Sequence, residues 1–441
     1  PVLVICPAVA KSVWQSEAAK WRPEYRVTVL EGRGSFRRPE PGEIVCVNYD
    51  ILPVTEQEIE AARAAADKAV NVAIDAIDRR RGPHEKEERA AWRAVIAWYD
   101  LRALPRVPEL RGTVVIVDEA HAAASSKSAR TKRVRALSKA ARDGGGKCWA
   151  LTATPLKNRP QELWNVLEVA GLAKEAYGSW PAFVRAFNGR EGKWGGYEWG
   201  TPREEAATLL QRVALRRRKT DVLADLPPKT YRSLPAAIDK ATAKLCDAAI
   251  TAIGGFPCIG SAIDKLMSSS LGFQELSAAR AALAKAKIPA MLEIVEQYEE
   301  SGEPLVVFSA YRAPVDLLAK RDGWATITGD TSTEDRGRIV ERFQAGELRG
   351  VACTIRAGGV AITLTRASNV LLVDREWNPA LNAQAEDRCY RIGQRSAVLV
   401  TLLVADHALD QRIAEVLTIK QRIIGASVDA ATVQHVALAA P

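Results

Sequence analysis

The sequence is poor in the features that build metal sites, disulfide frameworks and membrane spans. Its 441 residues contain four histidines and seven cysteines. No two cysteines form a C-x-x-C pair, and none stands at zinc-ligand spacing from a histidine. No apolar run approaches the roughly 20 residues of a membrane helix, and no cationic segment leads into a signal-like apolar run. These absences predict an intracellular protein with no membrane partner, whose cysteines are small apolar side chains in a reducing compartment.

The remaining composition is that of an ordinary globular protein. Hydrophobic residues make up 47% and charged residues 26% of the chain. At about 150 residues per domain, the length allows two or three domains. The net charge is +9, from 62 Lys and Arg against 53 Asp and Glu. Such an excess is compatible with a polyanionic partner but is weak support for one when taken alone.

Short β-branched runs alternate with longer Ala, Glu, Lys and Arg stretches, which is typical of parallel α/β units. Two series of such runs predict an α/β fold with two doubly wound parallel-sheet lobes, residues 1–225 and 226–441, joined at Pro227-Pro228. Helical insertions are expected at about 52–108, 157–220 and 242–300. The expected strands are Val2–Cys6, Tyr25–Leu30, Ile44–Asn48, Thr113–Val117, Cys148–Leu151, Leu305–Phe308, Trp324–Ile327, Gly350–Cys353, Val370–Val373 and Val398–Leu403.

The clearest chemical signal is an apolar strand that ends in Asp118 and Glu119. Strand ends at the carboxyl edge of a parallel sheet face the ligand crevice. One carboxylate there can hold magnesium, directly or through water, while the next polarises a water for attack on a phosphoryl group. The alternative is an Asp-Glu pair that interacts with a helix dipole. Thr152 and Thr154 end the next strand, where they either sense these acids or form an N-cap.

A second signal lies near the carboxyl end of the chain. Gln384, Arg388 and Arg391 are spaced i, i+4 and i+7, which predicts one face of a helix. Arginines in such a row can stabilise charge on a transferring phosphoryl group. The alternative is a solvated ion-pair face with Glu386 and Asp387.

Two further clusters allow more than one interpretation. Trp180, Trp194 and Trp199 flank a Gly-rich patch and form either a local core or a surface for base stacking or a partner. The run Arg216–Arg218 belongs either to a phosphate grip or to a solvated or lobe-pinning patch.

Together these segments resemble the motifs of superfamily-two helicases, and more closely those of the Swi/Snf-type (sucrose non-fermenting) DNA-dependent ATPases. The main carriers, in this order, are Asp118–His121 (DEAH), Leu151–Pro155 (LTATP) and Gln384–Gln394 (QAEDRCYRIGQ). The segments that match this family rather than helicases at large are Cys6–Trp21, Val47–Asp50, Leu215–Lys229, Thr328–Thr331, Thr354–Leu364 and Glu376–Pro379. The motif that begins at Thr354 departs from the family's usual sequence at two positions. Ile355 stands where the family commonly has Thr, and Ala361 stands where it commonly has Gly.

The resemblance implies two RecA-like lobes, ATP and Mg²⁺ as cofactors, and double-stranded or branched DNA as partner. Carried over by position, Asp118 and Glu119 are the metal-binding and water-activating acids, and Arg388 and Arg391 are arginine fingers. Other nucleotide contacts are expected from Gln384, His121 and Gly359, and coupling to DNA from Thr152 and Thr154. The implied DNA contacts are Lys11, Asn48, Tyr49, Ser309, Thr354 and Arg356.

The phosphate-binding loop of that family is missing from this sequence. Gly144-Gly145-Gly146-Lys147 ends in Cys148 and leads into a strand, and Gly189–Lys193 is followed by Trp194. Neither segment offers backbone N–H groups at a helix start, a lysine and a hydroxyl together. This chain alone is therefore expected to bind ATP poorly and to hydrolyse it very slowly. The favoured explanation is a fragment of a longer protein, and the alternative is a natural loss of the loop.

The expected function is ATP-driven translocation on double-stranded DNA, which remodels DNA structures or DNA–protein complexes in replication, repair or recombination. No chromatin-reading module is recognisable, and the direct run from the expected Pro289–Glu300 helix into Leu305–Phe308 resembles the annealing-helicase and fork-remodelling branch. The alternative is a catalytically silent DNA-binding clamp, and a third possibility is a strand-separating helicase or a restriction motor. The Ala- and Arg-rich composition indicates a bacterial or phage-infected cell, with a cytoplasmic, nucleoid-associated rather than nuclear location.

Overall fold

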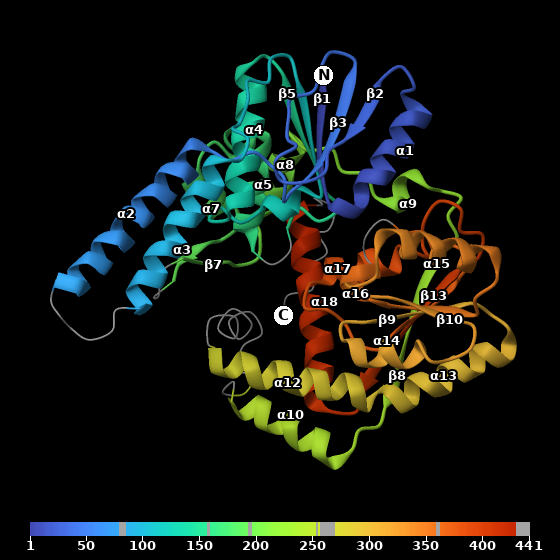
Figure 1. Cartoon of the computed structure of the whole chain (residues 1–441). Helices are drawn as coiled ribbons and strands as arrows, with labels where there is room; N and C mark the ends of the chain where they lie inside the picture. Colours follow the sequence, from blue (N-terminus) through green and yellow to red (C-terminus); the bar gives the residue numbers. More distant parts are fainter. Residues whose placement is uncertain are drawn as a thin grey trace. The chain divides into compact units, whose positions relative to one another are not determined.

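The structure, a computed structural model, describes residues 1–78, 85–156, 159–192, 196–252, 255, 270–358 and 362–428. The chain divides into two compact units, Pro1–Ala214 and Leu215–Pro441, and Figure 1 shows one parallel sheet in each. Trp194 and Gly359 lie outside the described residues.

Unit 1 is built on a five-stranded sheet in the order β2-β3-β1-β4-β5, with every neighbouring pair parallel. The order reverses between β1 and β4, so their carboxyl ends flank the switch point of the sheet, where ligands bind in open α/β folds. The strands are β1 (Val2–Cys6), β2 (Arg26–Val29), β3 (Glu43–Asn48), β4 (Val114–Asp118) and β5 (Lys147–Leu151).

Apolar side chains cover both faces of this sheet. Leu3 and Ile5 of β1 point into one core, with Val134 of α4 and Val166 of α5, while Val4 points into the opposite core beneath α1. Full burial of each such side chain stabilises the fold by about 1.5–3 kcal/mol. The alternation explains why the strands read as continuous apolar runs, since a strand buried on both faces has no polar side.

The helices of unit 1 include one projecting pair. Figure 1 shows α2 (Glu56–Asp78) and α3 (Glu85–Arg102) lying side by side away from the sheet, as expected for the first insertion. The other helices and the small β6–β7 hairpin are η1 (Ala8–Ala10), α1 (Lys11–Trp21), η2 (Ala120–Ala123), α4 (Ala129–Asp143), α5 (Pro160–Ala170), α6 (Ala173–Tyr177), α7 (Trp180–Ala186), β6 (Arg190–Glu191), β7 (Tyr197–Glu198) and α8 (Glu204–Gln211).

Unit 2 repeats the plan with six parallel strands in the order β10-β11-β9-β12-β13-β8, and its switch point lies between β9 and β12. Val306 and Phe308 of β9 face one core and Leu305 and Val307 face the other. The strands are β8 (Lys229–Ala236), β9 (Leu305–Ser309), β10 (Trp324–Ile327), β11 (Gly350–Thr354), β12 (Asn369–Leu372) and β13 (Val398–Ala405).

The insertion of unit 2 packs on the last helix of the chain. Apolar residues of α10 (Lys240–Ala252), α12 (Ser270–Ala286) and α18 (Ala408–Val428) share one core, and α10 and α12 lie side by side in Figure 1. The remaining helices are α9 (Lys219–Val222), α13 (Ile288–Ser301), α14 (Arg312–Leu318), α15 (Thr333–Ala345), α16 (Ile355–Gly358) and α17 (Pro379–Glu386).

The predicted fold class, α/β with two doubly wound parallel-sheet lobes, is confirmed. Each expected strand is present, with ends that differ by at most a residue or two. Strand β8 was not predicted, because its exposed polar residues and its nearby prolines look like a hinge. The units divide between Ala214 and Leu215, before the expected boundary at residue 225, and Lys219 binds Asp387 within unit 2. Among the described residues, no helix combines the length and the apolarity needed to cross a membrane.

The glycine run before β5 serves backbone packing. A Cβ atom on Gly146 would lie 2.0 Å from the carbonyl oxygen of Thr113, and one on Gly144 would lie 2.8 Å from that of Leu110. Gly145 between them has φ +79°, which favours glycine. The prediction that this run leads into a strand rather than a helix is confirmed.

We expect Gly146→Ala to lower the free energy of unfolding by several kcal/mol, because the backbone must shift to remove the overlap. Urea denaturation measures the loss. Gly34→Ala is the matched control, since nothing lies within 4 Å of a Cβ atom there, and it should change stability by less than about 0.5 kcal/mol. Equal stability of the two variants would contradict the close approach.

Candidate functional site

Two acids lie at the switch point of unit 1, where β4 ends beside β1. Asp118 is the last residue of the strand, and its carboxylate accepts hydrogen bonds from the indole Nε1 of Trp14 and the backbone N–H of Glu119, both at 2.9 Å. Trp14 comes from α1, the helix that follows β1. The parallel register β1–β4 therefore brings a residue distant in sequence against the acid.

Glu119 has a left-handed backbone with φ +49° and ψ +48°, one of two described non-glycine residues with positive φ. This conformation costs about 1–2 kcal/mol and is typical of functional sites. Tyr49 stabilises the turn at Asp118 and Glu119, because its hydroxyl donates to the carbonyl oxygen of Asp118 at 2.5 Å. The strained turn sends the side chain of Glu119 to the carboxyl edge of the sheet, beside His121.

His121 connects the acids to the next strand. Its Nδ1 lies 3.1 Å from Glu119 Oε2, 3.0 Å from Thr152 Oγ1 and 3.1 Å from Thr154 Oγ1. Thr154 N also donates to Thr152 Oγ1 at 3.0 Å. The nitrogen either donates one proton to one of these oxygens or, when unprotonated, accepts from a threonine hydroxyl, so a change at one partner alters its bonds to the others. The acid pair and the two threonines thus share one junction.

The electrostatics of the pair are set by burial. Burial raises the pKa of the Asp118 carboxyl, and the hydrogen bond from Trp14 partly offsets this effect. The nearby charge of Glu119 raises the pKa further. The same burial raises the pKa of Tyr49, which keeps its hydroxyl protonated as a donor.

The chemistry of these oxygens fits a magnesium ion held jointly with phosphate. Mg²⁺ in phosphate-processing sites takes one or two carboxylates, with water and substrate oxygens in the other positions. Each Asp118 oxygen accepts one hydrogen bond and keeps a lone pair for a metal or a metal-bound water. Among the described residues, at this site or any other, no group of three or more His, Cys, Asp or Glu is placed to hold a metal ion by itself.

The other unit 1 residues proposed for DNA lie near this edge. Asn48 ends β3 and its Nδ2 donates to Asp50 at 3.3 Å, and Lys11 Nζ donates to the carbonyl of Leu30 at 3.1 Å. Tyr49 is buried, with its hydroxyl engaged beneath Asp118. The structure gives Tyr49 a supporting contact with the acid loop, a role that its place in the motif did not indicate.

The prediction that Gln384, Arg388 and Arg391 share a helix face is wrong. Helix α17 ends at Glu386, and both arginines follow in turns that close with bonds such as Arg388 N to Ala385 O. They converge by another route, since the NH1 atoms of Arg388 and Arg391 lie 3.5 and 3.2 Å from the carbonyl oxygen of Ile362. Gln384 itself is half-buried on α17.

The turn after α17 is closed by Gln394. Its Nε2 donates to the carbonyl oxygens of Thr365, Ala367 and Cys389, and its Oε1 accepts from two backbone N–H groups that follow it. We call residues 387–394, which carry both arginines between α17 and Gln394, the arginine turn.

Of the unit 2 residues proposed for DNA, Ser309 has no exposed surface in this structure. It is fully buried, and its hydroxyl lies 2.6 Å from Asp374 across the switch point between β9 and β12. The side chain of Arg356 is 77% exposed, with Nε 2.6 Å from Glu376. Thr354 ends β11 and is half-buried. Gly359, proposed for the nucleotide, lies outside the described residues.

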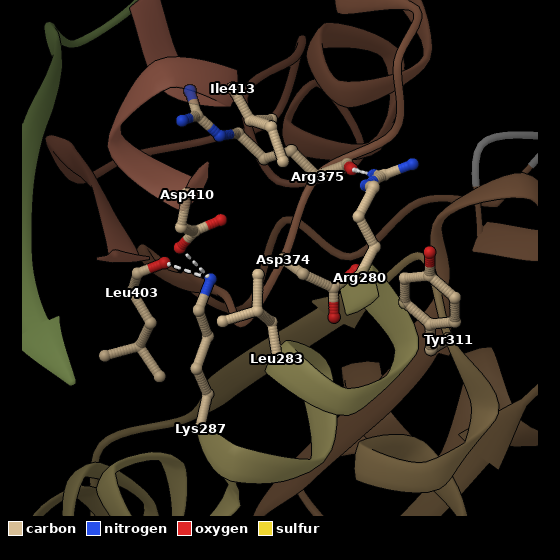
Figure 2. Close-up of a pocket in the computed structure, with 9 residues that line it drawn as sticks. All are labelled: Arg280, Leu283, Lys287, Tyr311, Asp374, Arg375, Leu403, Asp410 and Ile413. Carbon is tan, nitrogen blue, oxygen red and sulfur yellow. Dashed lines mark hydrogen bonds and ion pairs between the residues drawn. The ribbon is translucent and has the colours of Figure 1, made fainter. Parts of the chain in front are cut away.

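A buried cluster of charged residues lies beside β13 and α18, and its Arg280 contacts the loop that enters α17. Figure 2 shows the ammonium group of Lys287 between Asp410 and the carbonyl of Leu403, at 2.6 and 3.0 Å. Arg280 of α12 donates to the carbonyl oxygen of Arg375 and lies 4.3 Å from the ring centre of Trp377. The cavity between these groups holds about 20 Å³, enough for a water but not for a nucleotide. The cluster is therefore a support.

The tryptophans of the first-unit insertion belong to an aromatic cluster. The rings of Trp180 and Trp199 are 6.0 Å apart, and each contacts Phe183 at 5.5 and 6.0 Å. The local-core interpretation is thus favoured for these two. Trp194 lies outside the described residues.

The sequence did not predict which side chains would contact the motif residues. Trp14 and Asp118 are 104 positions apart, and Lys229 and Glu386 are 157 apart. No local spacing connects such pairs. What the sequence did offer was that each of these residues lies inside a segment that resembles a motif of the family.

Comparison with known proteins agrees with these motifs. Residues 1–268 match the family model of the SNF2-related domain, and residues 286–393 match that of the helicase conserved C-terminal domain. The human DNA annealing helicase and endonuclease ZRANB3 is 24% identical, over 97% of this chain and 36% of that protein. The SWI/SNF-related matrix-associated actin-dependent regulator of chromatin subfamily A-like protein 1 of Xenopus tropicalis is 30% identical, over 96% of this chain and 40% of that protein.

The chain spans only about two fifths of the length of these curated relatives. Among solved structures, the Sulfolobus solfataricus SWI2/SNF2 ATPase core in complex with dsDNA matches 98% of this chain and 83% of its own, at 21% identity and a TM-score of 0.36. The fold itself is established by the strand order and pairing described above.

We expect Trp14→Phe to destabilise the protein by about 2 kcal/mol at pH 7.5, because the ionised Asp118 loses a charge-assisted hydrogen bond. A carboxyl whose folded pKa is raised costs stability as the pH rises through that pKa, and the variant raises it further. The destabilisation should therefore shrink as the pH falls toward the unfolded value of about 3.9.

Urea denaturation at several pH values measures this effect. Trp21→Phe is the matched control, since Trp21 Nε1 donates to Glu17 at 2.9 Å from the same helix but is exposed. It should change stability by less than about 0.5 kcal/mol at every pH. A pH-independent loss in Trp14→Phe would refute the link to Asp118.

Proposed function

The chain belongs to the SNF2-related family, and on that premise we propose that it is the motor core of an ATP-driven double-stranded-DNA translocase. Its work is to remodel branched DNA or DNA–protein complexes in replication, repair or recombination. The similarity to a protein named as a DNA annealing helicase supports this branch. We further propose a nucleoid-associated location in a bacterial or phage-infected cell.

The observation that carries the proposal is the junction at His121. The acid Glu119 and the threonines of the next strand meet at one ring nitrogen. A translocase needs the nucleotide site to influence distant contacts, and a shared hydrogen-bonding group provides this coupling. A purely structural Asp-Glu pair at a helix start would need neither the left-handed backbone of Glu119 nor the two hydroxyl partners.

The proposed roles follow from these positions. Asp118 holds Mg²⁺ directly or through water, and Glu119 orients a water and takes up its proton. Arg388 and Arg391 stabilise negative charge on the phosphoryl group. ATP with Mg²⁺ supplies the phosphoryl-transfer chemistry when bound.

The proposed grip on DNA is directed to phosphates. Such contacts carry no sequence information, which suits a motor that runs over any sequence. The exposed Arg356, fixed by Glu376, is the described unit 2 residue best placed among those predicted, with Lys11 and Asn48 proposed for unit 1.

The central test is the ATPase rate of the full-length gene product with and without duplex DNA. We expect duplex to stimulate the rate, and Glu119→Gln to lower it at least about 100-fold while duplex affinity stays within about twofold, because only proton transfer is removed. No stimulation by duplex, or stronger stimulation by RNA, would contradict the proposal. Duplex binding without any turnover would indicate a silent clamp instead.

Salt dependence tests the phosphate grip. We expect Arg356→Gln to weaken duplex binding and to reduce the slope of log K against log salt by about 1, the loss of one phosphate contact. Fluorescence anisotropy over a salt series measures the slope. Arg89→Gln is the matched control, since Arg89 is 74% exposed and paired with Glu85 on the projecting hairpin. Equal slopes in the two variants would remove Arg356 from the grip.

A further inference from the structure

Two lysines at the start of unit 2 bind the end of α17. Lys229, the first residue of β8, places its Nζ 3.0 Å from Glu386 and 3.4 Å from Asp387. Lys219 of α9 places its Nζ 2.9 Å from the other oxygen of Asp387 and 2.6 Å from the carbonyl oxygen of Tyr390. Both ammonium groups also lie over the ring of Tyr390, at 5.3 and 5.2 Å.

A tyrosine completes this set. The hydroxyl of Tyr231, two residues along β8, donates to Glu386 at 2.7 Å. Glu386 is 6% exposed, so both of its strong partners are needed to satisfy its buried charge. We call Lys219, Lys229 and Tyr231 the clamp.

The charges in the clamp are held in a single arrangement. Burial by itself would lower the pKa of Lys229, but the carboxylates of Glu386 and Asp387 outweigh burial and raise it. Burial and the neighbouring Glu386 raise the pKa of Tyr231 to about 12, so its hydroxyl stays a donor. Removing one member of such a buried pair leaves an uncompensated charge, which the surrounding backbone must move to relieve.

The clamp acts where regular structure stops. Helix α17 ends at Glu386, and the arginine turn continues from it with separate backbone bonds, such as Cys389 N and Tyr390 N to Glu386 O, rather than with a continuous helical ladder. Its far end is fixed by the amide of Gln394, and its near end by the clamp on Glu386, Asp387 and Tyr390. Arg388 and Arg391 lie between these two anchors.

We propose that the clamp is a positioning device for Arg388 and Arg391, the arginine fingers of the proposed ATPase. This inference rests on the proposed function for its kinetic consequence, but not for the clamp itself. Because Lys219 and Lys229 lie near the start of unit 2, the clamp also makes the arginine turn depend on the segment with which this unit begins. An isolated ion pair on the surface would not position the arginines or link the turn to another segment, since exposed pairs contribute about 0–1 kcal/mol and fix no backbone.

The first test concerns the turn alone. In hydrogen–deuterium exchange of this chain, Lys229→Gln and Tyr231→Phe should each speed amide exchange in residues 387–394 by at least about tenfold. Tyr298→Phe is the matched control, because it removes a phenolic hydroxyl that donates to Asn369 at 3.3 Å in the same unit. It should leave the turn unchanged. Unchanged exchange of residues 387–394 in the folded clamp variants would overturn the proposal.

The second test uses the duplex-stimulated ATPase of the full-length gene product. Lys229→Gln should lower kcat about tenfold with the KM for ATP changed less than about twofold, and Lys229→Arg should recover most of kcat. Affinity for ADP with aluminium fluoride should fall in parallel with kcat, while affinity for ADP alone should not. Equal losses for both ligands, or a kcat within twofold of wild type, would refute the positioning role.

The two tests separate this inference from the proposed function. Faster exchange in the turn, in a wild-type protein that shows no duplex-stimulated ATPase, would leave the clamp standing and overturn the function. Normal stimulation in wild type with unchanged exchange and kcat in the clamp variants would do the reverse.

Discussion

The parallel pairing of the strands is the constraint on which both units depend. In unit 1 the register pairs Cys6 with Asn48 and Asp118 with Leu151, so the segments that follow these strands all leave from one edge. Parallel strands require covered crossovers, which explains the continuous apolar runs and the helices on both faces. Every functional group of unit 1 discussed above is delivered to that edge by this arrangement, including the strained Glu119 and the two threonines that meet His121.

The carboxyl edge of the sheet in unit 2 has a different role from that of the sheet in unit 1. Its switch point is occupied by a structural pair, Ser309 with Asp374, and the polar groups beyond it hold backbone in place. Arg280 holds the loop entering α17, Lys287 binds Leu403 and Asp410 at the end of β13, and the clamp with Gln394 holds the turn leaving α17. Several charged side chains of this unit therefore stabilise irregular chain segments. That use is reasonable where arginines must be presented from a turn, because a turn lacks the internal ladder that makes a helix rigid.

Much of the fold followed from local patterns. The β-branched runs gave every strand of the two sheets except β8, whose polar exposed residues and neighbouring prolines hide it at the edge of the sheet. The acids of β4 and the threonines of β5 were identified as neighbours because adjacent parallel strands end together. The helical spacing of Gln384, Arg388 and Arg391 misled, since a periodic sequence does not reveal where a helix stops, and here it stops at Glu386. The burial of Ser309 was equally invisible, because its partner Asp374 follows another strand.

What the sequence determined by itself was the α/β class, the motif set, and with it the SNF2-related family and the acid pair Asp118 and Glu119. These depend on short-range order along the chain, which is written directly in residue type and spacing. Tertiary structure alone decided which partners complete the motifs: Trp14 for Asp118, Tyr49 beneath the acid loop, and Lys229 with Tyr231 for Glu386. Such contacts join residues dozens to more than a hundred positions apart. They exist only after the sheets have formed and fixed the direction in which each strand ends.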